Sequence, residues 1–534
     1  MNPFPLYPID TLFSFLSHDS SSRVLRTIYG QDETVIHQRK TMLTTLLSGF
    51  TRQFPHETHA AILRVPGRIN LMGVHIDHQG GYTNYIPIAR ETLFCVSPRA
   101  DSLMDVRNLN ETYPSFLFSI EEETPAAPLA WEDFIETAPI QAGFWGNYIK
   151  AGALRLQSEW RHTPLQGMNL LVAGDIPPNA GVSSSSTLVV GTVLSLSQRN
   201  ALPVQPGQLV SLCGSAEWYV GTRGGAGDHA AMLQGKLHTV LNAGFKPFRA
   251  THHPFPADLD VLLIHSGVES NKATNTRKIF NSRIAAYAVS LELFKTLHPA
   301  YADRLQHLRD ISPNTLELPL ARFYPLLKAI PIEKTAHQIL TEFPQAREKM
   351  ESILARFQIE DDPLPLREVL LFGICECQRA QDFPQLLNPE KINEAGRAMS
   401  ISHDGDRVCT WERGTIQPYR SPFDDSYLDR LAELAANSQD SPMAGLARQP
   451  GGYRCSIPAM DRIVDECKTL PGVVGASLTG AGLGGAVIAL VQKERAPLLV
   501  ETLQIQLHEW NGEKAFVERC QPADGAGFVS LASV

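Results

Sequence analysis

The stretch GDIPPNAGVSSSSTLVV, residues 174–190, predicts a strand end, a stiff loop and a helix start in succession. Two prolines stiffen the loop after Asp175, Gly181 permits a tight turn, and four serines then open an apolar helix. A helix start offers unpaired backbone N–H groups and a partial positive charge, which favour a bound phosphate group. The serine hydroxyls add donors and a candidate ligand for Mg²⁺. A ligand-free serine cap is the alternative interpretation, and the segment is not a GxxxxGK[ST] phosphate loop because no lysine follows the glycine.

A second glycine-rich segment, SLTGAGLGGAVIALV, spans residues 477–491 and ends in a strand-like apolar run. Four glycines in six residues permit close approach of the backbone to a ligand or to another element. A bend between packed strands is the other interpretation. The segment therefore indicates a candidate phosphate contact without deciding it.

A third segment, SAEWYVGTRGGAGDHAAML, spans residues 215–233 and carries two carboxylates. Asp228 follows a glycine-rich turn at a predicted helix start, and Glu217 lies eleven positions upstream on a predicted helix. Aspartate in this position is commonly a helix cap. Near a phosphate site it can instead accept or orient a hydroxyl proton.

A fourth segment, PGRINLMGVHIDHQGG, spans residues 66–81 and holds His75, Asp77 and His78 in a glycine-framed turn. Metal binding, catalysis, substrate binding and loop capping are all compatible with that spacing. A zinc-type site is disfavoured because no second cluster of ligands is evident in the sequence.

The bulk properties bound the class of protein. The chain has 534 residues, 43% hydrophobic and 19% charged, with a formal net charge of −9. This length predicts two or three domains, and the acidic balance argues against nucleic acid or an anionic membrane as partner. The N-terminus lacks the pattern of a signal peptide and the apolar runs are too short to span a bilayer, so we expect a cytoplasmic protein. The eight scattered cysteines are expected to be reduced thiols.

Composition and periodicity predict the organisation of the chain. Residues 1–60 are expected to be mainly helical, and residues 285–400 to be helices interrupted by proline. A composition shift places a boundary near residue 250, which gives domains at 1–250 and 251–534. Residues 409–450 are predicted to form a loop-rich insertion with a short helix.

Together these segments resemble the galactokinase branch of the GHMP kinases, a family of small-molecule kinases. The resemblance runs in the family's order through PGRINLMGVHIDHQGG, WGNYIKAG, PPNAGVSSSST, GGAGDHAAM, NTRKIFNSR, CSIPAMD and SLTGAGLGG, and leaves 409–450 unmatched. It implies an α+β, two-domain GHMP kinase fold. In that fold a ribosomal-protein-S5-like N-terminal domain and an α/β C-terminal domain enclose the active site in the cleft between them. It also implies ATP and Mg²⁺ as cofactors, a monosaccharide as substrate, and no obligate protein partner.

The resemblance assigns roles by motif. Asp228 matches the catalytic aspartate that faces the anomeric hydroxyl, and Arg68 matches the arginine beside the transferred phosphoryl group. Ser185 and Glu217 match the Mg²⁺ ligands, although Glu217 lies one residue closer to Asp228 than expected for galactokinases. The implied phosphate-binding set is Gly181, Ser183, Ser184, Ser185, Ser186, Gly480 and Gly482. The implied sugar-binding set is Val74, His75, Asp77, His78, Gly227 and Phe280.

Three departures from galactokinases bear on the sugar. Val74 replaces an acidic residue that contacts the 6-hydroxyl, and His78 and Phe280 stand where tyrosines are expected. Losing an anion there favours a sugar with a carboxylate at C6, since like charges repel strongly in a dry pocket, and the HIDHQGG wording is similar to galacturonokinases. We therefore expect a D-galacturonate 1-kinase, with His78, Arg223 and Lys272 as candidates to meet the carboxylate. A galactokinase or amino-sugar kinase with a remodelled pocket, and a non-catalytic sugar sensor, are the alternatives.

Overall fold

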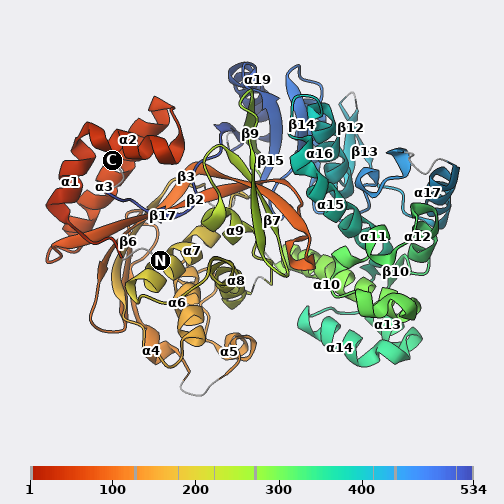
Figure 1. The fold of residues 1–534 in the computed structure, drawn as a ribbon, viewed down its shortest axis with the longest axis horizontal. Coiled ribbons are helices and arrows are strands. Elements are labelled where there is room, and N and C mark those ends of the chain that lie inside the picture. The colour runs from red at the N-terminus through yellow and green to blue at the C-terminus, as the bar shows by residue number, and fades with distance from the viewer. Residues whose placement is uncertain are drawn as a thin grey trace.

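The fold was analysed in a computed structural model, which describes residues 4–125, 129–177, 180–221, 223–269, 274–412, 414–437, 442–512 and 514–531. Two large β-sheets, two small two-stranded sheets and the helices around them form the described part of the molecule (Figure 1). The first sheet has nine strands. Its main path runs β1 (Tyr7–Pro8), β2 (His59–Met72), β3 (Tyr82–Pro98), β6 (Met168–Gly174), β4 (Leu103–Asn108) and β5 (Phe116–Ser119).

Three further strands extend this sheet. β7 (Thr239–Gly244) pairs with β3 and with β8 (Arg249–Pro254), and β17 (Gly527–Phe528) pairs with β2. The chain therefore returns at its C-terminal end to the sheet with which it began. The predicted second domain, 251–534, accordingly includes a segment that completes the first sheet.

Helices cover both faces of the first sheet because its strands carry apolar residues on both sides. Leu93, Cys95 and Leu171 pack against α1 (Ile9–Ser17), α2 (Asp19–Tyr29) and α3 (Glu33–Gln53). Phe94 and Val96 face the other way, toward α6 (Asn147–Glu159), α7 (Ser184–Arg199) and α8 (Pro206–Ala216). This alternation explains near-continuous apolar runs in strands that are buried on both faces.

The second sheet has the order β14 (Val473–Leu478), β15 (Ala486–Gln492), β9 (Leu259–His265) and β16 (Phe516–Cys520). One of its faces packs on α10 (Thr274–Leu297), α15 (Leu366–Leu386), α18 (Pro458–Cys467) and α19 (Ala496–Asn511). Residues of the other face, including Val261, Leu263 and Ile488, share a buried cluster with Ile69 and Leu71 of β2 and with α16 (Ile392–Asp406). This shared core fixes the position of one sheet against the other.

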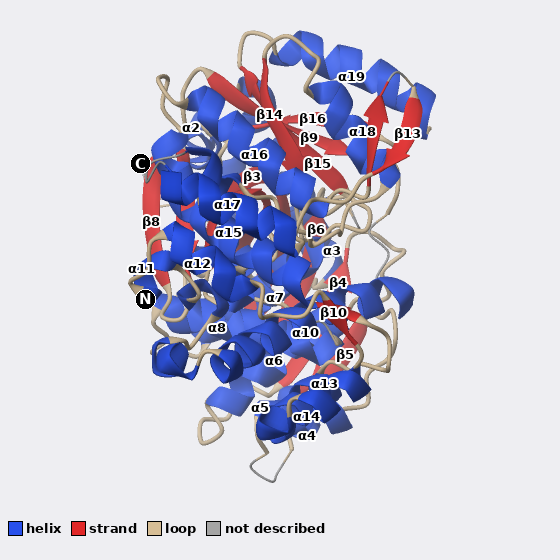
Figure 2. Ribbon diagram, turned by 90° about the vertical axis from the view of Figure 1, so that its right-hand side faces the viewer, coloured by secondary structure: helices blue, strands red, loops and turns tan. Residues whose placement is uncertain are grey.

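The remaining helices gather beside α10 and α15 (Figures 1 and 2). They include α12 (Leu320–Leu327), α13 (Ala336–Glu342), α14 (Arg347–Arg356) and α17 (Asp425–Asn437). The predicted loop-rich segment 409–450 contains the hairpin β12 (Cys409–Glu412) and β13 (Thr415–Pro418) in addition to α17. Three further helices are short: α4 (Ile120–Glu123), α5 (Trp131–Thr137) and α11 (Pro313–Leu316).

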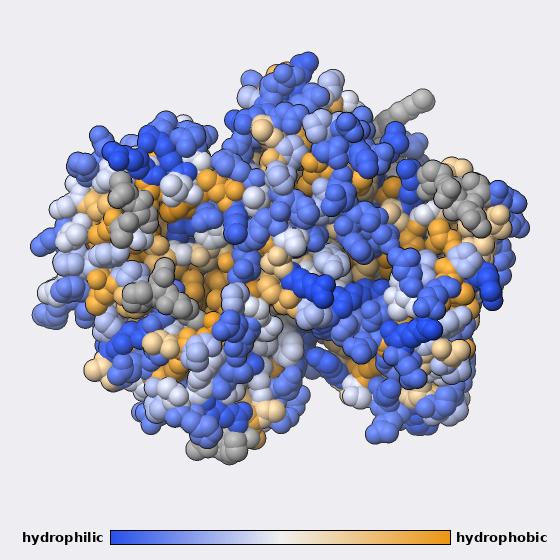
Figure 3. Space-filling view, in the orientation of Figure 1, coloured by the Kyte–Doolittle hydropathy of each residue, from blue (hydrophilic) through white to orange (hydrophobic). Residues whose placement is uncertain are grey.

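The predicted helical character of residues 1–60 is confirmed by α1–α3, and that of residues 285–400 by α10–α16. All eight cysteines are buried and unpaired, as expected for reduced thiols. Within the described residues, no helix has the length and apolarity needed to cross a bilayer. The face in Figure 3 is largely hydrophilic, with apolar surface exposed between α1–α3 and α6.

Candidate active site

A cavity of about 890 Å³ brings the predicted motifs together. The end of β2, the turn that follows it, the serine segment and α9 (Gly227–Gln234) contribute to its wall. Among the residues assigned from sequence, its lining includes Arg68, His75, Asp77, His78, Gly181, Ser183, Ser184, Ser185, Ser186, Glu217, Asp228, Phe280 and Gly480. Residues separated by up to 412 positions in the chain thus meet at one site.

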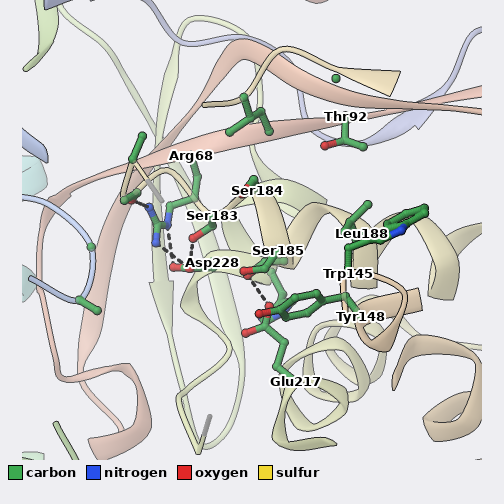
Figure 4. Close-up of a pocket in the computed structure, with 18 of the residues that line it drawn as sticks. Arg68, Thr92, Trp145, Tyr148, Ser183, Ser184, Ser185, Leu188, Glu217 and Asp228 are labelled. Carbon is green, nitrogen blue, oxygen red and sulfur yellow. Dashed lines mark hydrogen bonds and ion pairs between the residues drawn. The ribbon is translucent and has the colours of Figure 1, made fainter. Parts of the chain in front are cut away.

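Arg68 and Asp228 form a two-pronged ion pair at the centre of this wall (Figure 4). Arg68 donates from Nε to Oδ1 and from Nη2 to Oδ2, each at 2.6 Å, and from Nη1 to the carbonyl oxygen of Gly181 at 2.6 Å. Burial alone would lower the pKa of Arg68, but the adjacent Asp228 carboxylate raises it above its ordinary value. The pair therefore holds the Asp228 carboxylate at the start of α9, facing the cavity.

The four serines divide into two pairs. Ser183 donates to Asp228 Oδ2, and Ser186 donates to Glu217 Oε1 at 2.5 Å. Ser184 and Ser185 begin α7 and line the cavity between these two carboxylate contacts. The side chain of the N-cap residue, Ser183, makes no capping hydrogen bond to α7, so the cap interpretation does not account for this serine. The first N–H groups of α7 stay available to a phosphate group.

The loop glycines pack the serine segment against the second sheet. A Cβ atom on Gly480 would lie 2.9 Å from the carbonyl oxygen of Gly181, and both glycines have positive φ angles, +81° and +77°. Gly482 does not line the cavity: a Cβ atom there would lie 2.1 Å from the carbonyl oxygen of Cys455. Gly482 is therefore explained by backbone packing against residue 455.

The Asp77 carboxylate is held by hydrogen bonds from two backbone segments, its own turn and the start of α9. Its Oδ1 accepts the backbone N–H of His78 at 2.9 Å, and its Oδ2 accepts the backbone N–H of Gly227 at 2.9 Å. Burial alone would raise the pKa of Asp77, but hydrogen bonds from His78 and Gly227 outweigh it and lower that pKa to about 2. Gly227 thus contributes as the residue that orients Asp77, directly beside the catalytic candidate Asp228.

The two histidines of the turn have different surroundings. His78 Nδ1 lies 3.1 Å from Asp77 Oδ1. His75 has φ 64° and stacks on the ring of Tyr453, with centroids 4.1 Å apart. Both line the cavity together with Phe280. Within the described residues no group of three metal-ligating His, Cys, Asp or Glu side chains occurs.

Two candidate sugar contacts, Val74 and Arg223, do not line the cavity. Val74 is 4% exposed and belongs to the apolar core around α10 and α15, so its side chain is packed away from the cavity wall. The guanidinium of Arg223 lies over the ring of Trp218, 5.6 Å from its centroid, and also does not line the cavity. Lys272 lies outside the described residues.

The sequence interpretation missed the apolar end of the cavity. Trp145, Tyr148 and Leu188 project there from α7 and from the segment that begins α6 (Figure 4). Met42 on α3 and Leu109 after β4 also line the cavity. Trp145 is anchored by its indole N–H, which donates to the carbonyl oxygen of Pro114 at 3.0 Å. The motif WGNYIKAG carried the signal, but helical spacing alone indicated only a packed face.

Comparison with protein families agrees with this arrangement. The GHMP kinase N-terminal domain matches residues 147–236, the GHMP kinase C-terminal domain matches residues 424–509, and the galactokinase galactose-binding signature matches residues 48–98. The C-terminal match begins within 409–450, the segment that the motifs left unmatched. The signature spans Arg68, His75 and Asp77.

Individual proteins give the same result. The galactokinase of Roseiflexus sp. (strain RS-1) is 25% identical over 471 residues, covering 88% of this chain and 93% of that protein. The galactokinase of Schizosaccharomyces pombe is 24% identical over 524 residues, covering 93% of this chain and 96% of that protein. The structure of Lactococcus lactis galactokinase complexed with galactose superimposes with a TM-score of 0.64 at 20% identity, covering 91% of this chain and 99% of that one. The fold is that of the GHMP kinases, and the family matches and relatives together support a place for the chain on the galactokinase branch of that superfamily.

Proposed function

We propose that this protein is an ATP-dependent kinase that phosphorylates the anomeric hydroxyl of a monosaccharide, and that the monosaccharide is D-galacturonate. The observation that carries the proposal is the Arg68–Asp228 pair. This pair joins the serine segment to the glycine-framed turn that holds His75, Asp77 and His78, called the sugar-signature turn below. Arg68 contacts Gly181 of the phosphate side, and Asp228 adjoins Gly227, which orients Asp77 on the sugar side. A carboxylate placed between the two can orient or accept the proton of an attacking hydroxyl.

The two ends of the cavity suit the two substrates of such a reaction. The apolar surface of Trp145, Tyr148 and Leu188 suits the adenine ring of ATP, because a planar base packs well against aromatic and aliphatic side chains. Ser184, Ser185 and the first N–H groups of α7 would then meet the phosphates. Asp77 would accept hydrogen bonds from ring hydroxyls at the other end, since its carboxylate stays ionised.

The donor set between these ends fits Mg²⁺. Ser185 supplies a hydroxyl oxygen and Glu217 a carboxylate oxygen, both hard ligands of the kind that Mg²⁺ takes alongside nucleotide phosphates. Bound there, the ion would neutralise phosphate charge during transfer. The hydrogen bond from Ser186 to Glu217 holds that carboxylate toward the cavity.

The assignment of D-galacturonate is supported by the charges around the turn. His75 and His78 both line the cavity. Two cations approach the turn from its outer side: Lys246 Nζ donates to the carbonyl oxygen of His78 at 2.9 Å, and Arg309 Nη1 donates to that of Gly80 at 2.6 Å. The Asp77 charge is already matched by hydrogen bonds. A sugar carboxylate would therefore meet imidazoles and positive potential at this end.

The test is a panel of free sugars and uronic acids, with ADP release from ATP as the readout. D-Galacturonate should give the highest kcat/KM, ahead of galactose, glucuronate and galactosamine. A preference for galactose would leave the kinase proposal intact and replace its substrate. An absence of sugar-dependent ADP release in a folded preparation that binds ATP would favour a non-catalytic sugar sensor.

A further inference from the structure

His75 occupies an unusual backbone conformation inside the cavity wall. Its φ of 64° lies in the left-handed region, which costs energy for a residue with a side chain. The sugar-signature turn is therefore not self-supporting at this residue. Something outside the turn has to hold His75 in place.

The support comes from the C-terminal half of the chain. The His75 ring stacks on Tyr453 with an interplanar angle of 14°, and Phe372 of α15 lies 6.1 Å away, measured between ring centroids. His75 Nε2 lies 3.3 Å from Oδ1 of Asp406, the last residue of α16. That separation is an ion-pair distance, although among the described residues neither His75 Nε2 nor Asp406 Oδ2 has a hydrogen-bond partner.

Apart from His75, few groups compensate the charge of the Asp406 carboxylate. It is fully buried, its Oδ1 accepts the backbone N–H of Cys455 at 3.2 Å, and the nearby Arg283 donates instead to the carbonyl oxygen of Tyr453. A buried carboxylate is costly unless a cation or proton donor compensates it. Here the imidazole Nε2 of His75 lies 3.3 Å from Asp406 Oδ1. A small rotation of the imidazole ring would complete a hydrogen bond between these two atoms.

We propose that Asp406 is a positioning residue for sugar binding, acting through His75. By drawing a proton to Nε2, it sets the ring orientation and directs the other nitrogen, Nδ1, away from itself and toward the sugar. The inference rests on the proposed kinase function, because it assigns His75 to the sugar and not to ATP. Asp406 itself lies behind the cavity wall and touches neither substrate.

A second pair on the same helix provides a matched control. His403 Nε2 lies 3.2 Å from Asp461 Oδ1, and both side chains are fully buried. Asp461 also accepts the backbone N–H groups of Val408 and Cys409. Neither member of this pair lines the cavity. Its chemistry is that of the first pair, while its place in the fold gives it no contact with the sugar.

The experiment compares Asp406→Asn with Asp461→Asn by steady-state kinetics and thermal unfolding. Both variants should lower Tm. Asp406→Asn should raise the KM for the sugar about tenfold while kcat and the KM for ATP stay within about twofold. Asp461→Asn should leave the sugar KM within about twofold. In a His75→Gln background, adding Asp406→Asn should have no further effect on the sugar KM, because the two residues act as one unit.

Three results would overturn the inference. The first is that Asp406→Asn raises the KM for ATP as much as the KM for the sugar. The second is that Asp461→Asn raises the sugar KM as much as Asp406→Asn does. The third is that Asp406→Asn raises the sugar KM equally in the wild-type and His75→Gln backgrounds. If Asp406→Asn does not fold, sugar titration of Asp406→Glu by calorimetry replaces it, and unchanged sugar affinity there would also overturn the inference. A wild-type protein that phosphorylates no sugar would instead contradict the proposed function, so the two failures are distinguishable.

Discussion

Replacing Asp228 with Asn tests the residue on which the proposed chemistry depends. The side chain keeps its size, but an amide cannot accept hydrogen bonds at both positions where Arg68 and Ser183 donate. An NH₂ group in the place of Oδ1 then faces the Arg68 Nε–H, and one in the place of Oδ2 faces both the Arg68 Nη2–H and the Ser183 hydroxyl. The charge that compensates the Arg68 guanidinium is lost as well, and Arg68 is only 4% exposed.

The structure sets the size of two separate effects. The Asp228 side chain is 29% exposed, so water can partly replace the missing partner and the free energy of unfolding should fall by only about 1–3 kcal/mol. Loss of a positioned carboxylate should lower kcat by a factor of about 100 to 10,000. The variant should therefore be folded and nearly inactive.

The assay is coupled detection of ADP at saturating ATP and sugar, with Tm measured on the same preparation. Ser183→Ala is the control, because it removes one hydrogen bond from Asp228 but leaves both contacts with Arg68. Its kcat should fall by about tenfold or less. A folded Asp228→Asn protein with kcat within threefold of wild type would refute the role assigned to this carboxylate.

Four further predictions follow from the same contacts. Ser185→Ala should raise the Mg²⁺ concentration needed for half-maximal rate while leaving the sugar KM unchanged, and an unaltered metal titration would remove Ser185 from the ligand set. Trp145→Ala should raise the KM for ATP roughly 5- to 150-fold, the equivalent of about 1–3 kcal/mol for a base stacked on an aromatic ring, with the sugar KM as internal control. Val74→Glu should lower Tm sharply, because it buries a carboxylate in an apolar core; full stability would mean that the side chain reaches solvent or the cavity. Asp77→Asn should be less stable than wild type by a constant margin above about pH 4. That margin should shrink at lower pH, because the Asp77 pKa is about 2 in the folded chain against an ordinary 3.8; denaturant unfolding at several pH values gives the comparison.

The sequence predicted which segments form the candidate active site, but not which hydrogen bonds their side chains make there. The order of glycines, serines and carboxylates indicated a helix N-terminus and a nearby acid, and the structure brings them into one cavity. It did not show that Ser183 and Ser186 would be used by Asp228 and Glu217. Those contacts join segments 31 and 45 residues apart, and no local pattern encodes them.

At position 74, motif comparison identifies the residue but not the direction of its side chain. The loss of an acid there is visible in the sequence, but the direction of the side chain depends on packing against α10 and α15. The support of His75 by Asp406 and Tyr453 is likewise set by tertiary structure, since 331 and 378 residues separate them from the turn. The return of β17 to the first sheet escaped prediction for a similar reason, because a two-residue strand carries no periodic signal.

The most direct test of the central claim is the position of the phosphate in the product. After incubation with ATP, Mg²⁺ and D-galacturonate, the ³¹P NMR spectrum should show one new sugar phosphate whose phosphorus couples to the anomeric proton. Its appearance should match ADP formation in a one-to-one ratio. Phosphate on any other hydroxyl, or ADP formation with inorganic phosphate as the product, would contradict the account of Asp228 as the group that faces the anomeric hydroxyl.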